Sequence, residues 1–270
     1  MCLAVLALER HPRFPLVLAA NRDEFFDRPA APLDWWRTEP NGTELLSGRD
    51  LQAGGTWLGL TRQGRLGLLT NIRAPQRMRA DAPSRGTIVT TWLDGAEPPE
   101  VFWQRTVEGG YNGFNLIAAD FANARCHWLS SDHVQPALLG PGLYGLSNAA
   151  LDEPWPKVRR IKSSAAQALC ETATLDSLRT DLFQALRHSA AADDAELPNT
   201  GLTLAMERTL SAVFIHSDDG RYGTRCSTLV ISERGDDAQL RTHVFERSFD
   251  REGGVTADRH VLLPAWPTAR

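Results

Sequence analysis

The sequence has little of what would assign it at once to a metal, redox or nucleotide-binding class. Its four cysteines, in 270 residues, are far apart and form neither a C-x-x-C pair nor a Cys/His ligand spacing, which argues against a structural zinc site. The seven histidines are scattered, with no pair at ligand spacing. The chain also has no phosphate loop and no dinucleotide fingerprint. We therefore expect no metal and no cofactor.

The chain also lacks a long hydrophobic run and a strong excess of either charge. The apolar run from Cys2 to Leu8 is too short to span a bilayer and has no basic segment before it. It is followed by Glu9 rather than by the small residues of a cleavage site. The formal net charge of −4 gives no electrostatic reason to bind nucleic acid. We expect no transmembrane segment, no nucleic-acid partner and a cytoplasmic location with reduced thiols.

Strand patterns are present at both ends of the chain. Leu3–Leu8 and Phe14–Ala20 are apolar runs separated by the charged segment ERHPR, which predicts a hairpin. Further hairpins are expected within 57–70 and 113–131, and three more strands within 211–249.

Helical periodicity lies between these ends. It covers 155–171 and 175–188, and more weakly 84–103, where GAEPPE interrupts it. Strands at both ends with helices between them predict a single layered α+β domain over residues 1–270.

Cys2 carries the first chemical hypothesis. Methionine aminopeptidase commonly removes Met1 when the next side chain is small, and this would leave a thiol and a free amine on one Cα. An α-amino group has a pKa of about 7.7 to 8.0 and a thiol about 8.5, so the amine can accept the thiol's proton and later return it. The alternative is that Cys2 is a small buried hydrophobe at the start of a strand.

The tetrapeptide NRDE ends the second apolar run. Strand alternation predicts that Asn21 and Asp23 share one face, while Arg22 and Glu24 share the other. Asp23 would then reach the Cys2 amine, and Asn21 and Arg22 would bind substrate. A charged turn closed by surface ion pairs is the alternative.

Polar residues also follow apolar segments further along the chain. Asn71, with Arg73 close behind, has the amide that an oxyanion hole requires, although a turn-forming asparagine fits the same pattern. Asn148 follows a second such segment. Arg225 lies in a strand otherwise built for burial and needs a carboxylate, a substrate group or an internal salt bridge as its partner. Trp57 would wall an apolar pocket or pack in the core.

Several motifs together resemble a known family. They are MCLAVLA, NRDEFFDRP, GRDLQAGGTWLGL, LLTNIRAP, SRG, GFNLI, GLSNA, PWPK and GTRCSTLV. In this order they resemble the NRDE family, also called the transport and Golgi organisation protein 2 family, from Cys2 to Phe249.

This family is similar to N-terminal nucleophile hydrolases of the cholylglycine hydrolase and acyltransferase kind, so the resemblance implies a four-layer α/β/β/α sandwich of two antiparallel sheets. The resemblance implies that Cys2 is the nucleophile and that Asp23 is the carboxylate that positions its amine. It implies that Asn71 is the oxyanion-hole amide and Asn148 a second polar group at the nucleophile. Arg225 would be the arginine of the pocket. One position differs: those hydrolases carry an arginine two or three residues before the aspartate, where this chain has Ala20, and Arg22 abuts Asp23 instead.

Two functions follow as hypotheses. The first is a cysteine hydrolase or acyltransferase that acts on a small-molecule amide, acyl compound or thioester through an acyl-enzyme on Cys2. The second is a non-catalytic protein of the same fold that binds or traffics haem or an acyl lipid. An inert interaction module is a third reading, but it leaves the polar residues at the strand ends unexplained.

Overall fold

The chain divides into two compact units, each built around one antiparallel sheet. The computed structural model describes residues 2–39, 41–133, 135–235 and 239–267. The described residues among 1–27 and 141–265 form the first unit, and those among 28–140 and 266–270 form the second. The expectation of a single domain over 1–270 stays a prediction.

The first unit contains a six-stranded sheet in the order β10-β1-β2-β11-β12-β13, in which every neighbouring pair is antiparallel. Its strands are β1 (Cys2–Leu8), β2 (Leu16–Phe25), β10 (Gly142–Leu146), β11 (Tyr222–Arg234), β12 (Leu240–Phe249) and β13 (Val255–Leu263). The N-terminal hairpin therefore lies in the middle of the sheet, beside a strand from the far end of the chain.

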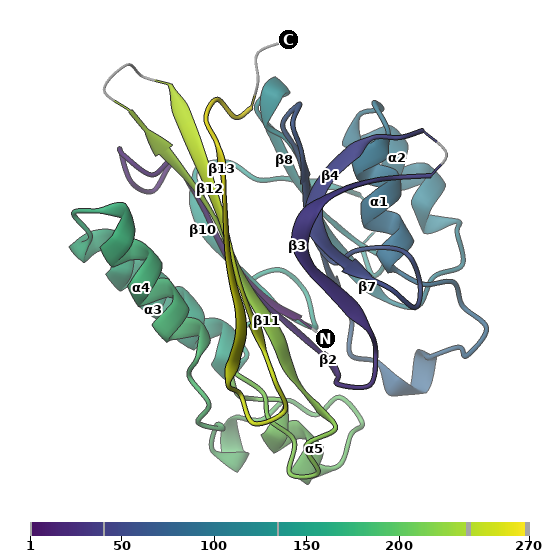
Figure 1. Ribbon diagram of the computed structural model, residues 1–270. Helices are drawn as coiled ribbons and strands as arrows, with labels where there is room; N and C mark the ends of the chain where they lie inside the picture. Colours follow the sequence, from purple (N-terminus) through teal and green to yellow (C-terminus); the bar gives the residue numbers. More distant parts are fainter. Residues whose placement is uncertain (1, 40, 134, 236–238, 268–270) are drawn as a thin grey trace. The chain divides into compact units, whose positions relative to one another are not determined.

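Two helices cover one face of this sheet: α3 (Pro156–Glu171) and α4 (Leu175–Leu186), which lie side by side in Figure 1. Helix α4 begins at a capping box, in which the Thr174 side chain accepts a hydrogen bond from the Ser177 backbone. Apolar side chains from both helices meet those of the strands in one buried cluster, which includes Leu3, Ile161 and Leu182. The unit also contains η3 (Asp194–Glu196) and α5 (Leu204–Thr209).

The second unit contains a seven-stranded sheet in the order β3-β4-β5-β6-β7-β8-β9. Its strands are β3 (Ala30–Arg37), β4 (Glu44–Asp50), β5 (Leu58–Thr61), β6 (Arg65–Asn71), β7 (Phe114–Asp120), β8 (Arg125–Ser130) and β9 (Ala137–Leu138). Helices α1 (Gly86–Asp94) and α2 (Pro99–Val107) pack against it through a cluster that includes Trp92, Phe102 and Phe114. Two short 3₁₀ turns complete the unit, η1 (Pro75–Arg77) and η2 (Phe121–Asn123).

The expected α+β class with two antiparallel sheets is confirmed, as are the three hairpins and the helices. Helices α1 and α2 are the interrupted pattern of 84–103, separated at GAEPPE. Strands β3 and β4 were missed. Strand β3 contains Pro32, which removes a backbone donor, and a sheet tolerates this because β3 is an edge strand.

The prediction of three strands within 211–249 is wrong. That segment supplies β11 and β12, and the third strand, β13, comes after it. Residues 211–217 form only one isolated bridge, between His216 and Gly223. Within this segment the apolar residues Ala212–Ile215 are buried in a loop, where the backbone N–H of Phe214 donates to the carbonyl of His188 and the carbonyl of Ile215 accepts from the backbone of Thr224. Among the described residues, no helix is long and apolar enough to cross a membrane.

Candidate functional site

The residues predicted from the sequence fall into both units. Those in the first unit are Cys2, Asn21, Arg22, Asp23, Asn148 and Arg225. Those in the second unit are Trp57, Asn71 and Arg73. The first group gathers at one end of the six-stranded sheet, as the strand registers show.

Arg22 is the central residue of this end of the sheet. It pairs in register with Cys2 on β1 and with Cys226 on β11, so it lies between two cysteine positions. The backbone of Cys2 is described by the structure, whereas its side chain lies outside the described part. Leu146 of β10 pairs with Ala4 of β1. Because the two strands are antiparallel, extending the register from this pair by two residues leads to Asn148 opposite Cys2. Asn148 therefore lies at the same end of the sheet as Cys2.

Asn21 is buried on the face of the sheet that the helices cover. Its Nδ2 donates to the backbone carbonyls of Leu186 and Val213, both at 2.9 Å, and its Oδ1 accepts from the Ser227 hydroxyl at 2.6 Å. Both amide hydrogens are thus used within the fold, and a substrate would have to compete with these bonds. A substrate-binding role for Asn21 stays a prediction.

Asp23 lies two residues along the same face and is also buried. The hydroxyl of Thr224 donates to its Oδ1 at 2.7 Å. Burial raises the pKa of this carboxyl above its ordinary value, while the Lys157 ammonium and the Thr224 hydroxyl act in the opposite direction. Two opposing effects therefore act on the pKa of Asp23: burial raises it, and the nearby positive charge lowers it.

Lys157 belongs to this cluster, although the sequence analysis did not select it. It lies in the first turn of α3, is only 2% exposed, and donates from Nζ to Oδ1 of Asn148 at 3.4 Å. The same oxygen accepts from the Ser147 hydroxyl at 3.2 Å. The spacing of the sequence could have indicated its burial, because Lys157 lies four residues before Ile161, on the buried face of the helix. A lysine is almost never fully buried unless it is paired.

Arg22 and Arg225 lie close to each other. The Arg22 guanidinium is 5% exposed and lies 3.9 Å from the Glu24 carboxylate, which confirms that these two side chains share a face. Arg225 is the extra residue of a β-bulge between Thr224 and Cys226, and its guanidinium donates to the carbonyl of Phe25 at 2.8 Å. Burial, followed by the positive charge of Arg22, lowers the pKa of Arg225.

In the second unit, Asn71 is the last residue of β6, as expected, and is half-buried. Alternation places it on the same face as Leu69, which belongs to the cluster under α1 and α2. Thr70 points to the opposite face, where its hydroxyl accepts from Nδ2 of Asn115 at 3.2 Å. Asn115 Oδ1 in turn accepts from the indole of Trp128. This buried polar chain is a second feature that sequence reasoning missed.

Trp57 and Arg73 occupy different parts of the second unit. The Trp57 ring lies against the backbone of Gly48 in β4, where a Cβ would come within 2.4 Å of it. This contact fits core packing, which was one of its two interpretations. Arg73 is 9% exposed and follows β6 by two residues. The substrate-binding roles of both residues stay predictions.

The remaining cysteines differ from Cys2 in position. Burial raises the pKa of the Cys126 thiol to about 12, so this residue is not a nucleophile near neutral pH. Cys226 is buried, and Cys170 is exposed on α3.

Among the described residues, no group of three or more His, Cys, Asp or Glu side chains could hold a metal ion.

Comparison with known proteins assigns the family. Residues 1–251 match the family model for Transport and Golgi organisation 2. The chain belongs to this family. The Transport and Golgi organization protein 2 homolog of Bos taurus is 34% identical over 290 residues, covering 99% of this chain and 95% of the relative. The Transport and Golgi organization protein 2 of Drosophila melanogaster is 27% identical and covers 92% of each chain.

A solved structure extends the comparison to the fold of this Transport and Golgi organisation 2 family member. It is the R18L variant of conjugated bile acid hydrolase from Clostridium perfringens, with a TM-score of 0.50, 8% identity, and coverage of 96% of this chain and 92% of that chain. At this identity the likeness shows the fold alone. It confirms the expected fold, that of the N-terminal nucleophile hydrolases.

Proposed function

We propose that this family member is a cysteine N-terminal nucleophile hydrolase or acyltransferase that cleaves an amide or thioester bond through an acyl-enzyme on Cys2. The observation that carries the proposal is the register of Cys2 with Arg22, at the sheet end that also holds Asp23 and Asn148. The shared fold with a bile acid hydrolase supports the class of reaction. A cytoplasmic location is part of the proposal.

The reaction begins after Met1 is removed. The Cys2 sulfur attacks the substrate carbonyl carbon, and the α-amine of the same residue accepts the thiol proton. The carbon–nitrogen or carbon–sulfur bond then breaks, and the amine returns the proton to the departing amine or thiol. Water, or an acceptor amine or alcohol, attacks the resulting thioester, which releases the acyl product and restores the thiol.

The neighbouring residues take supporting roles. The positive charge of Arg22, opposite Cys2, favours the thiolate and takes the place of the arginine that related hydrolases carry where this chain has Ala20. Asp23 holds the α-amine, and Lys157 and Thr224 favour the ionised form of Asp23. Asn148 and Arg225 contact the substrate from the ends of β10 and β11. The oxyanion-hole role expected of Asn71 stays a prediction.

The test is intact mass spectrometry of the purified chain with a panel of amides and thioesters. We expect a mass that lacks Met1 and a transient acyl adduct, and Cys2→Ala abolishes this adduct. Cys170→Ala, which removes an exposed thiol on α3, is the matched control and retains the adduct. A native protein that still begins with Met1, or an adduct that persists in Cys2→Ala, would overturn the proposal.

The alternative reading predicts a different outcome. A carrier of haem or acyl lipid would bind haem saturably, seen in the Soret band, and give no adduct with any member of the panel. That combination of results would replace the catalytic proposal.

A further inference from the structure

A pocket of about 310 Å³ lies within the second unit, and none of the roles above uses it. Three chain segments line it: 72–79, 107–114 and 131–132. The first and third follow the ends of β6 and β8, and the second runs from the last residue of α2 to the first residue of β7. Its volume is at the lower end of the roughly 300–1,000 Å³ typical of small-molecule sites. The pocket therefore suits a small ligand.

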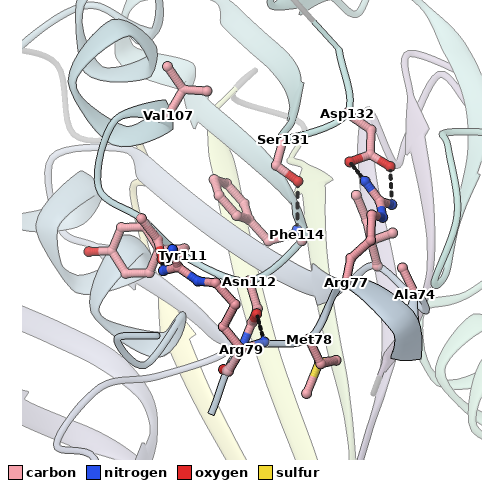
Figure 2. Close-up of a pocket in the computed structure, with 13 residues that line it drawn as sticks. Ala74, Arg77, Met78, Arg79, Val107, Tyr111, Asn112, Phe114, Ser131 and Asp132 are labelled. Carbon is pink, nitrogen blue, oxygen red and sulfur yellow. Dashed lines mark hydrogen bonds and ion pairs between the residues drawn. The ribbon is translucent and has the colours of Figure 1, made fainter. Parts of the chain in front are cut away.

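The charged groups of the pocket are arranged on two sides. Figure 2 shows Arg77 and Asp132 on one side and Arg79 and Tyr111 on the other, with Phe114 between them. Arg77 and Asp132 form a bidentate pair, with nitrogen–oxygen distances of 2.9 and 2.7 Å. The hydrogen bonds from Arg77 keep the pKa of Asp132 below its ordinary value, so this carboxyl is ionised near neutral pH. These two charges compensate each other.

Arg79 is the charged residue of the pocket that does not take part in this pair. The Asp81 carboxylate, which is 87% exposed, lies 4.0 Å from the Arg79 guanidinium, a distance and exposure at which an ion pair contributes little. Two arginines and one carboxylate therefore give the pocket one net positive charge. A monoanion matches this charge, whereas a dianion would also meet the repulsion of Asp132.

The position of Arg79 is fixed before any ligand arrives. The Asn112 side chain accepts from the backbone N–H of Arg79 and donates to its carbonyl, both at 2.8 Å. The guanidinium also donates to the carbonyl of Gly110. Because one neighbouring segment holds both the backbone and the head group, Arg79 loses little freedom when it binds an anion.

Apolar side chains supply the rest of the pocket. Phe114 and Ile72 form its buried part, while Met78 and Val107 are exposed by 56% and 48%. Exposed apolar side chains beside an uncompensated guanidinium favour a ligand with an apolar body and an anionic end.

We propose that this pocket binds a small organic monocarboxylate, with the carboxylate on Arg79 and the apolar body against Phe114 and Val107. The site uses side chains of the second unit only, and the proposal does not rest on the chemistry proposed for Cys2. It adds a ligand site to the Transport and Golgi organisation 2 fold.

Isothermal titration of the full chain with three matched probes tests the proposal: phenylacetate, neutral phenylacetamide and dianionic phenyl phosphate. We expect saturable binding of phenylacetate in the millimolar range or tighter, with both other probes at least about tenfold weaker. Equal binding of the amide would overturn the assignment of the anion to Arg79. Tighter binding of the phosphate would overturn the choice of a monoanion, and no saturable binding of phenylacetate would overturn the site.

Variants locate the ligand. Arg79→Gln weakens phenylacetate binding at least about tenfold, while Arg79→Lys, which keeps the charge, retains most of it. Val107→Thr, which keeps the shape but replaces one methyl group with a hydroxyl, weakens the binding of all three probes. Arg37→Gln removes an exposed arginine of the same unit, one that is paired with Glu44, and leaves binding unchanged. Cys2→Ala also leaves it unchanged. An equal loss in Arg37→Gln, or a loss in Cys2→Ala, would show that the ligand binds elsewhere.

Discussion

The Thr224 hydroxyl joins two buried groups: it donates to Oδ1 of Asp23 at 2.7 Å and accepts from the backbone N–H of Ile215 at 2.9 Å. Thr224→Val removes both bonds without changing the volume, so we expect the free energy of unfolding to fall by about 1–3 kcal/mol. Thr224→Ser keeps the hydroxyl and costs clearly less. Urea denaturation of the two variants measures the difference, and equal losses would show that the bonds are not the cause.

Lys157 is expected to act through Asp23. Its positive charge opposes the rise in the Asp23 pKa that burial causes, so Lys157→Met should raise this pKa further and move the acid limb of the acylation rate to higher pH. Lys157→Arg keeps the charge and restores part of the profile. Lys162→Met removes a partly exposed lysine of the same helix, paired with Asp152, and leaves the profile in place. A lower rate with an unmoved acid limb would contradict this role.

Arg22 should control the reactivity of Cys2. Since Arg22 lies opposite Cys2 in the β1–β2 register, we expect the loss of its positive charge in Arg22→Gln to shift the alkylation profile of Cys2 to higher pH. Alkylation by iodoacetamide, followed peptide by peptide at several pH values, measures this shift. Arg22→Lys keeps the Cys2 profile near that of the native chain. Cys170 is the internal control, and a shift common to both cysteines would point to a general effect on folding.

We expect two stacked histidines to make the first unit sensitive to acid. His243 Nδ1 lies 3.0 Å from His260 Nε2, and both rings stack with Phe245. Burial lowers the pKa of both histidines. Between the lowered pKa values and the ordinary value of about 6.5, the unfolded chain binds more protons than the fold. The free energy of unfolding should therefore fall as pH is lowered through this window.

His260→Phe tests this origin of the acid sensitivity. The substitution keeps an aromatic ring in the stack and removes one titrating group, so the fall in stability between about pH 8 and pH 5.5 should become shallower. Urea denaturation at both pH values measures it. An unchanged fall would place the acid sensitivity in other groups.

Gly55 allows two backbone segments of the second unit to approach each other. A Cβ at this position would lie 2.5 Å from the carbonyl carbon of Gly86, which no side-chain movement can relieve. Gly55→Ala should therefore lower the free energy of unfolding by about 1–3 kcal/mol or more. Gly140→Ala, where nothing lies within 4 Å of the added methyl, serves as the control in thermal denaturation. Similar midpoints for the two variants would rule out the clash.

Local patterns in the amino-acid sequence were sufficient for most elements of secondary structure. The hairpin of β1 and β2, the helices α3 and α4, and the break between α1 and α2 each depend on periodicity and turn residues within one short segment. The polar strand ends were visible for the same reason, and the motifs that contain them led to the right family. Apolar character alone was misleading at 211–217, because a buried loop and a buried strand have the same composition.

Residues far apart in the chain decided the rest. Asp23 and Thr224 are 201 positions apart, and only the pairing of β2 with β11 brings them into contact. Lys157 meets Asn148 because α3 packs on the sheet next to β10, and the pocket around Arg79 is assembled from three separate segments. Burial and cross-strand register depend on the whole fold, whereas periodicity is a property of neighbours. The chemistry of the strand ends could thus be proposed from the residues, but their partners could not.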